Sequence, residues 1–491
     1  MLRVRSTGSL GGNLATYTFI DVAMTEECDN VERVVMRATK AKTNPVLVPD
    51  RPWEGLNARV YGTVIFDDEE QLFKMWYISH HHPDREVYNL YAYSEDGMNW
   101  IKPELGIVNY KGCPANNIFA VESRVGMHIP SVIKLPDAPP DQRYLCFAYH
   151  KGGLNLFHSP DGVHWQAHGN NPVLPAFGDV WHVVYDEKTD SFLATGKVPT
   201  EAGRSVAVSI STDGINWDPA NQLVLKGTQR DHWLGLTAAA GLWWTPPLGN
   251  QPVLDEDQDP YRAKQFGGQI YGMPAFPYAD MYVGLVWAYQ SDALMETQLA
   301  WSRDRLTWCR DPRRTTIIER GYQGSFDSKM IMGTATRPLI VNDEIWLYYG
   351  GFDVRHHYPI TAESPWKGAA VGLAKWRLDG FVALVNAAGH NPRLVTSGRP
   401  GSALTQAVPV VGDRLSVNVD SSDGELRVEV CDGDSGQAIP GFSPQECKPI
   451  VIDSTATTVC WQHGDLRALK GRHVRLRFHL SNAWLYSFSF R

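Results

Sequence analysis

Three acidic residues each come just before a run of apolar residues that predicts a buried strand. Glu54 precedes the first such strand, Asp179 adjoins the third, and Asp327 precedes the fifth. Two facing carboxylates can serve as a proton donor and as a base or nucleophile. We therefore take these three as candidate catalytic residues. Each also has a structural alternative: Glu54 could cap a turn, and Asp179 and Asp327 could form Asx turns.

The same strands carry side chains that could bind a ligand. The candidates are His128, Trp181, His182, Tyr271 and Arg337. Arg337 stands in an otherwise apolar run, where a guanidinium needs a carboxylate partner or an anionic ligand. The structural alternative for Arg337 is an ion pair with Asp179 or Asp327.

Metal-binding patterns are weak in this sequence. Residues 80–82 are three consecutive histidines, but adjacent side chains point in different directions and rarely bind one ion together. The seven cysteines show no CxxC pair and no spacing typical of metal ligands. We expect no metal, no cofactor and reduced thiols, with one disulfide among Cys431, Cys447 and Cys460 as the alternative.

A repeated motif predicts how the candidate residues are positioned. Each copy has Ser, then Asp two residues later and Trp four residues after that Asp. The copies begin at Ser94, Ser159, Ser211 and Ser302, and a weaker relic spans residues 374–380. The Asp carboxylate accepts hydrogen bonds from the N–H groups that follow it, and the next residue, usually Gly, takes a positive φ. Four such hairpin turns indicate a repeated structural unit.

Strand patterns complete each unit. The innermost strands are predicted at 61–66, 130–135, 180–185, 270–276 and 334–340, and the second strands at 72–77, 144–149, 192–195, 282–287 and 345–349. With the strands on both sides of the turn, each unit is a four-stranded sheet, and five such sheets predict a five-bladed β-propeller. An insertion at 228–269 lengthens the third interval.

The pattern changes after residue 380. Residues 381–491 alternate apolar and polar side chains over short runs separated by Gly, Asp and Ser, which predicts a β-sandwich. The predicted fold is thus all-β: a five-bladed β-propeller followed by a β-sandwich. Residues 51–380 would form the propeller as the catalytic domain. Residues 1–50 would lead into the propeller or pair with the sandwich.

Composition narrows the partners. The net charge of −8 comes without a basic stripe, which argues against nucleic acid. No apolar run approaches the ~18–20 residues that span a membrane. The N-terminus lacks the apolar segment of a secretory signal, so we expect a cytoplasmic protein. Seventeen tryptophans suit a carbohydrate ligand, because flat aromatic faces stack on sugar rings. The oligomeric state is not indicated.

The repeat and the following sandwich resemble the five-bladed glycoside hydrolases related to families 32, 43 and 68. The segments 44–54, 62–65, 73–77 and 298–300 resemble a bacterial branch labelled family-32-like. The resemblance implies a carbohydrate substrate, a furanoside or related small glycoside, cleaved at the mouth of the propeller channel by a carboxylate pair.

Two alternatives stay open. One is a phosphorylase resembling the five-bladed mannoside phosphorylases, in which phosphate replaces water and one Asp suffices. Its cationic pocket could come from His128, His182, Arg337 and His356. The other is a sugar-binding propeller without catalytic activity.

Overall fold

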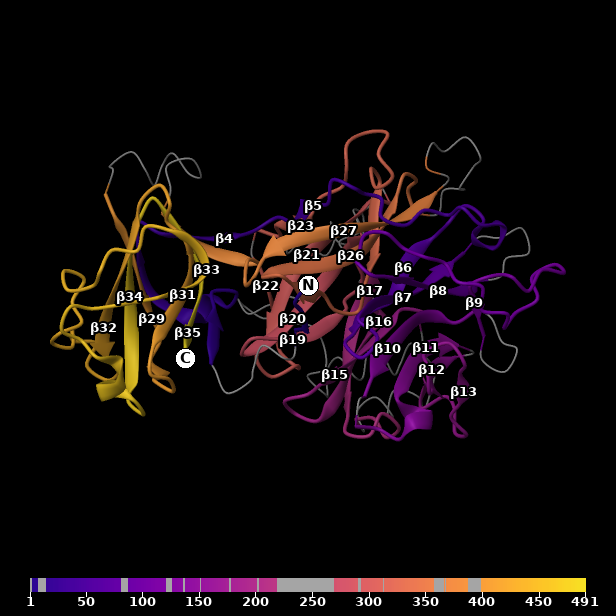
Figure 1. Ribbon diagram of the computed structural model, residues 1–491, viewed down its shortest axis with the longest axis horizontal. Coiled ribbons are helices and arrows are strands. Elements are labelled where there is room, and N and C mark those ends of the chain that lie inside the picture. Colours follow the sequence, from indigo (N-terminus) through magenta and orange to yellow (C-terminus); the bar gives the residue numbers. More distant parts are fainter. Residues whose placement is uncertain are drawn as a thin grey trace. The chain divides into compact units, whose positions relative to one another are not determined.

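The protein consists almost entirely of β-strands (Figure 1). The computed structural model describes residues 2–7, 15–80, 87–120, 126–135, 137–150, 152–175, 178–200, 203–218, 269–289, 293–311, 313–356, 366, 368–386 and 399–491. The chain forms two compact units. The first comprises Met1–Gly8, Ala38–Asn342 and Trp346–Lys375, and the second comprises Ser9–Arg37, Asp343–Ile345 and Trp376–Arg491.

In the first unit the strands pair into five successive groups, the predicted blades. The first blade is β6 (Arg59–Asp67), β7 (Leu72–Ser79), β8 (Tyr88–Ser94) and β9 (Ile118–Phe119). The second is β10 (His128–Lys134), β11 (Tyr144–His150) and β12 (Gly153–Ser159), with β13 (Gln166–Ala167) and β14 (Leu174–Pro175) on its edge. The third is β15 (Trp181–Asp186), β16 (Ser191–Thr200) and β17 (Gly203–Ser211).

The last two blades use split strands. The fourth has β18 (Gln269–Gly272) and β19 (Ala275–Tyr278) against β20 (Met281–Tyr289), then β21 (Met295–Ser302) with β22 (Trp308–Arg310) and β23 (Thr316–Ile318). The fifth has β24 (Met330–Thr334), β25 (Leu339–Val341), β26 (Glu344–Phe352) and β27 (Ala369–Arg377). The prediction of a five-bladed β-propeller is thereby confirmed.

The N-terminal part of the chain completes the fifth blade. Figure 1 shows β5 (Thr39–Lys40, indigo) beside β27 (orange), and Lys40 pairs with Ala374. β1 (Val4–Ser6) pairs with β25 in the same blade. The outer strand of the last blade therefore comes from the beginning of the chain.

The motif turns lock the blades into a ring. Each turn contacts the second strand of the preceding blade, and the first turn contacts the fifth blade. The contacting pairs are Gly97 with Tyr348, Gly162 with Trp76, Gly214 with Phe147 and Arg305 with Ser191. The fourth and fifth blades pair directly through Met295 and Met330. Contacts therefore run around the whole ring.

These contacts explain why glycine occupies three of the four turns. Gly162 has φ +83, which L side chains rarely adopt, and an added Cβ atom would lie 2.8 Å from Cζ2 of Trp76. We expect Gly162→Ala to lower the free energy of unfolding by roughly 1–3 kcal/mol. Gly152→Ala is the matched control, since Gly152 has φ +84 but open space around the position. Equal losses in urea denaturation for the two variants would show that the contact with Trp76 does not matter.

The predicted fifth inner strand was misplaced. It begins at Met330, not Thr334, and it breaks before β25, so Arg337 lies in a bend between β24 and β25. Pro338 explains the break, because it has no N–H for the ladder and restricts the residue before it. Apart from Gln269, the insertion at 228–269 lies outside the described residues.

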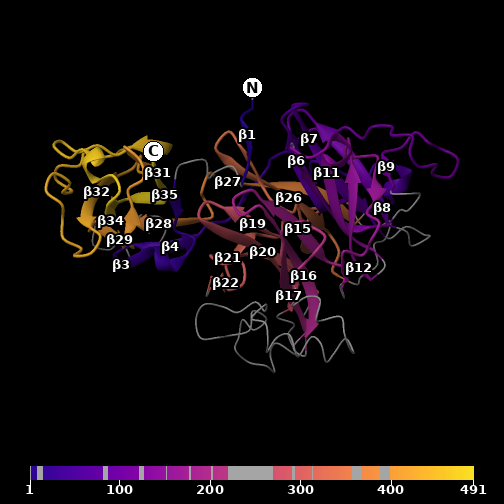
Figure 2. The same cartoon turned by 90° about the horizontal axis from the view of Figure 1, so that it is seen from below.

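The second unit contains two antiparallel sheets. One has β33 (Asp453–Thr458), β31 (Leu415–Asp420), β35 (Ala483–Phe490), β28 (Val382–Asn386), β4 (Glu32–Val35) and β2 (Thr16–Thr18). The other has β3 (Thr25–Asp29), β29 (Gly401–Thr405), β34 (His473–Ser481), β30 (Val408–Pro409) and β32 (Glu425–Asp432). Phe478 and Phe488 meet between the sheets with ring centroids 5.5 Å apart, as in a sandwich. Figure 2 shows β4 beside β28.

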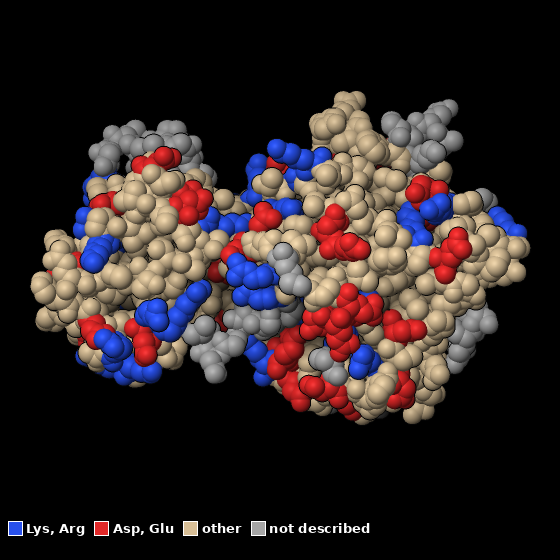
Figure 3. Space-filling model, in the orientation of Figure 1, with Lys and Arg blue, Asp and Glu red and all other residues tan. Residues whose placement is uncertain are grey.

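The surface shows no sign of a large basic area on the face in Figure 3, where Lys and Arg stay in separate small groups and acidic side chains gather over the lower part of the first unit. Among the described residues, no helix has the length and apolar character needed to cross a membrane.

Candidate active site

The first strands of all five blades meet at one end of the propeller channel. One buried cluster takes a residue from the beginning of each: Tyr61, Ile129, Val180, Tyr271 and Met330. The second strands end beside them, since His128 pairs with Tyr149 and Met330 pairs with Phe352. Side chains at these strand ends therefore lie at one end of the propeller axis, which we call the mouth.

Irregular pairing marks this end of the strands. Extra residues bulge from the first strand between Arg59 and Thr63, His128 and Ser131, Ile270 and Gly272, and Ile331 and Thr334. Ile129 has φ 53, an unusual backbone conformation for a β-branched residue. Bulges change the direction of side chains and are common beside binding sites. Four of five blades thus depart from regular pairing where the candidate residues lie.

Asp179 is the acidic residue at the centre of this mouth. Its carboxylate lies 2.5 Å from Nζ of Lys197 on β16. Burial alone would raise the pKa of Asp179, but the charge and hydrogen bond of Lys197 outweigh burial, so the pKa is lower than usual. The Asp179 side chain is still 42% exposed, whereas Lys197 is 14% exposed. Asp179 is therefore an ionised carboxylate that a ligand can reach.

Tyr271 joins the Asp179–Lys197 pair to one further cation and a histidine. Its ring centroid lies 4.3 Å from Nζ of Lys197 and 5.6 Å from Cζ of Arg204. Its hydroxyl lies 3.1 Å from Nε2 of His356. Burial, together with the negative charge of Asp179, raises the pKa of Tyr271 to about 12, so the hydroxyl keeps its proton near neutral pH.

Arg59 adds a buried cation at the start of β6. Its guanidinium lies over the rings of Tyr61 (4.8 Å) and Phe352 (5.7 Å). Burial lowers the pKa of Arg59, while the charge of Asp179 favours its protonated form. No described residue accepts a hydrogen bond from its Nε, which is buried. Such a group has donors available for a ligand.

The two histidines of the candidate set are neutral near pH 7. Burial lowers the pKa of His128, at the opening of β10, to about 4, although the charge of Asp179 opposes this. Burial lowers the pKa of His182 to about 3. The His182 ring packs edge-on against the Trp287 ring, with the ring centroids 4.9 Å apart. Neither histidine therefore supplies the positive charge that a phosphate pocket requires, whereas Arg59, Lys197 and Arg204 do.

Glu54 and Asp327 lie in polar networks of their own. The Glu54 carboxylate is fully buried and accepts hydrogen bonds from Tyr77, Lys102 and the backbone N–H of Asp50 and Arg51. The Asp327 carboxylate is also buried and accepts hydrogen bonds from Ser325 and Tyr349, both at 2.8 Å, and from Lys40. Both groups hold the fold of their own segments.

Two binding candidates lie away from Asp179. Trp181 packs into the core between the second and third blades, against Gly196 of its own blade. Arg337 forms an ion pair with Glu187 at 3.3 Å, just after the end of β15. Because Asp179 precedes the beginning of that strand, Arg337 and Asp179 lie at opposite ends of it.

Sequence reasoning missed Arg59, Lys197 and Asp353. Arg59 stands in an apolar run, so the rule that selected Arg337 would also have selected it. Lys197 follows Gly196, which pairs with Trp181, so hairpin register would have placed it beside Asp179. Asp353 directly follows Phe352 at the end of β26 and accepts a hydrogen bond from the Trp366 backbone at 3.4 Å. Its carboxylate thus follows a residue of the cluster at the end of a second strand.

The described residues contain no group of three or more His, Cys, Asp or Glu placed to hold a metal ion. Of the three consecutive histidines, His80 is described, and its ring centroid lies 5.4 Å from that of His128. His81 and His82 lie outside the described residues.

No family model and no curated protein matches the sequence. Among solved structures, the protein is similar to a thermostable family-43 glycoside hydrolase (15% identity, TM-score 0.42), with 70% of this chain and 95% of that chain covered. It is also similar to an α-L-arabinofuranosidase from Podospora anserina (11% identity, TM-score 0.42), with 70% of this chain and 98% of that chain covered. A third similar structure has a title that describes a family of mannoside phosphorylases containing glycoside hydrolases (12% identity, TM-score 0.42), with 70% of this chain and 94% of that chain covered. Each name describes that protein alone.

Proposed function

We propose that the protein cleaves a glycosidic bond of a furanoside or related small glycoside, with Asp179 as the ionised carboxylate of the reaction. The observation that carries the proposal is the exposed Asp179 carboxylate held by Lys197 where the strands of five blades meet. Mouths of this kind, lined by aromatic rings and a few converging polar groups, suit a small polar ligand. The propeller, predicted as residues 51–380, would hold the activity.

The chemistry divides between two carboxylates. Asp179, with its lowered pKa, suits the base or nucleophile, because that group must be ionised to act. Asp353, at the end of β26, would donate the proton to the leaving oxygen. Lys197 keeps Asp179 ionised and positioned, and the Tyr271 hydroxyl and the Arg59 guanidinium offer donors for sugar hydroxyls.

Phosphorolysis is a second candidate, favoured by the excess of cations. Arg59 and Lys197 lie near the carboxylate of Asp179, and Lys197 and Arg204 lie over the ring of Tyr271. A phosphate ion bound there would take the place of the water that attacks the sugar. One carboxylate then suffices, as proton donor, so Asp179 would have to be protonated, against its lowered pKa. For this reason we rank hydrolysis first.

The test is a substrate panel with and without phosphate. Purified protein would be incubated with aryl furanosides, aryl pyranosides and short oligosaccharides, and reducing sugar and sugar 1-phosphate would be measured separately. Hydrolysis predicts reducing sugar at equal rates in both buffers. Sugar 1-phosphate that forms only with phosphate would favour phosphorolysis. Binding without any product across the panel would contradict both and support the non-catalytic alternative.

The ion pair also predicts a pH dependence. With Lys197 present, the pKa of Asp179 lies below its usual value of about 3.9, so Asp179 should stay ionised and activity should persist to below about pH 4. In Lys197→Met, burial acts without the lysine and raises the pKa, so the acid limb of the kcat/KM profile should move to higher pH. Lys197→Arg keeps the charge and should leave the limb near its original position. Identical profiles for all three proteins would remove Lys197 from this role.

A further inference from the structure

Tyr322 is an aromatic side chain that the proposed chemistry does not use. It lies in the segment between β23 and β24, and it is 80% exposed. The other large apolar side chains exposed in the described part of the chain reach at most 58%. The segment ends where β24 begins at Met330, which belongs to the buried cluster of the channel mouth. Tyr322 therefore belongs to the segment that leads into this mouth at the fifth blade.

The backbone that carries Tyr322 is firmly held. Its carbonyl accepts a hydrogen bond from the N–H of Ser325 at 3.0 Å. Ser325 in turn donates to the buried carboxylate of Asp327, and the N–H of Gly321 donates to the Asp327 carbonyl at 3.1 Å. Since Asp327 is also held by Lys40 and Tyr349, the turn has few conformations left to lose when a ligand binds.

Trp366 is a second aromatic residue, and it contacts the same turn from a later part of the chain. Its indole Nε1 donates to the carbonyl of Gly324 at 2.7 Å, and its ring meets Phe326 edge-on at 6.0 Å. Its backbone N–H donates to Asp353, which follows the last residue of β26. A continuous set of contacts therefore leads from the channel mouth through Asp353 and Trp366 to the turn of Tyr322.

We infer that Tyr322 and Trp366 form a binding subsite for a second sugar unit, next to the one whose bond is cleaved. The inference rests on the proposed function and specifies its substrate as an oligosaccharide. A pyranose or furanose presents C–H groups on one face and hydroxyls at its rim, so it can stack on an aromatic ring while its hydroxyls stay in water. The fixed turn and the exposed ring of Tyr322 supply such a surface.

The experiment compares substrates with one and two sugar units. KM for the best oligosaccharide and for the matching aryl monoglycoside would be measured for the wild type, Tyr322→Ala, Trp366→Ala and Tyr322→Phe. In each alanine variant we expect the oligosaccharide KM to rise roughly three- to tenfold more than the aryl glycoside KM. Tyr322→Phe keeps the ring and should resemble the wild type. Ile101→Ala, an exposed apolar residue beyond the first motif turn, is the neutral control.

A binding assay separates failure of the subsite from failure of the proposed function. If the wild type cleaves no glycoside, oligosaccharide binding to the wild type and to Tyr322→Ala would be titrated by tryptophan fluorescence. Weaker oligosaccharide binding by Tyr322→Ala than by the wild type would then support the subsite, although the proposed cleavage had failed. Equal KM ratios in all variants, or equal affinity where there is no turnover, would overturn the subsite. Thermal melting would show that the alanine variants are folded.

Discussion

Asp179→Asn should lower kcat/KM by roughly 10²–10⁴-fold while leaving the folded protein intact. The amide has nearly the shape of the carboxylate, so the contact with Lys197 loses its charge but the packing stays. Because Asp179 is partly exposed and lies outside the strand ladder, the fold does not depend on it. Steady-state kinetics on the best substrate, with thermal melting as the measure of folding, would give the result.

Asp50→Asn is the matched control for this prediction. Asp50 is also a partly exposed carboxylate paired with a lysine, at 2.7 Å from Nζ of Lys102, but its ion pair belongs to the network of Glu54. Its kcat/KM should stay within about twofold of the wild type, in line with the small effects of surface substitutions. Full activity of Asp179→Asn would remove Asp179 from the reaction.

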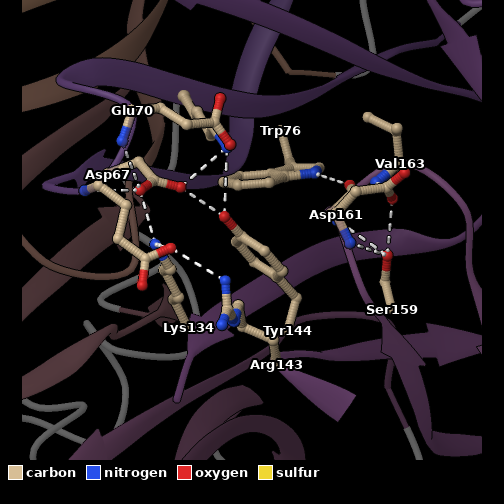
Figure 4. Close-up of polar contacts among 12 residues, drawn as sticks. Asp67, Glu70, Trp76, Lys134, Arg143, Tyr144, Ser159, Asp161 and Val163 are labelled. Atoms are coloured by element: carbon tan, nitrogen blue, oxygen red, sulfur yellow. Dashed lines mark hydrogen bonds and ion pairs between the residues drawn. The ribbon is translucent and has the colours of Figure 1, made fainter. Parts of the chain in front are cut away.

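Asp67→Asn should lower the free energy of unfolding by about 3–5 kcal/mol. The buried Asp67 carboxylate accepts hydrogen bonds from Lys74 (2.8 Å), Lys134 (2.6 Å) and the Tyr144 hydroxyl (2.5 Å). Figure 4 shows Lys134 and Tyr144 beside Asp67. Lys74 is 2% exposed, so an amide at position 67 would leave a buried ammonium with less negative charge beside it. Urea denaturation at pH 7 would measure the loss.

Asp186→Asn tests whether the lysines cause this effect. Asp186 is the last residue of the first strand in the third blade, and Asp67 has the same position in the first blade. Each carboxylate accepts a hydrogen bond at 2.5 Å from a tyrosine at the start of the second strand of the next blade, Tyr282 for Asp186 and Tyr144 for Asp67. The other hydrogen bonds to Asp186 come from Thr189 and the Lys188 backbone. Asp186→Asn should therefore lower the free energy of unfolding by only about 1–2 kcal/mol. Equal losses at the two positions would contradict the role of the lysines.

The Asp67 network also has a pH dependence whose sign can be stated. Burial favours the protonated acid, but Lys134, Lys74 and Tyr144 together lower the pKa of Asp67 well below its usual range. The stabilisation is therefore present above the ordinary pKa of about 3.9 and is lost as the pH falls toward the lower folded value. The stability difference between the wild type and Asp67→Asn should narrow below about pH 4.

The repeat made the propeller predictable from the sequence. Four turns with the same residues in the same order can only be explained by a repeated unit, and the apolar runs beside them gave the strand order. The outer strand of the fifth blade could not be predicted, because β5 is two residues long and pairs with β27 far along the chain. The break at Pro338 moved Arg337 off the strand, although the proline itself was a visible signal.

The candidate site was only partly predictable. Asp179, His128 and Tyr271 share the channel mouth because all three come at the beginning of inner strands, as the patterns suggested. The same reasoning selected Glu54 and Asp327, yet sequence alone does not tell a carboxylate whose oxygens are already hydrogen-bonded within the protein from one with room for a ligand. That difference depends on Tyr77, Lys102, Tyr349 and Lys40, which lie far away in the sequence.

The origin of β5 has a consequence for how the chain folds during its synthesis. Lys40 leaves the ribosome early, but its strand partner and its ion-pair partner, Ala374 and Asp327, are made after the other four blades. Loop closure over such a distance is costly in entropy and is reached late. The last blade would therefore be completed only when the whole propeller has been synthesised. Nascent chains stalled before β27 should be sensitive to protease at the N-terminal segment, and chains extended past Arg377 should be protected there.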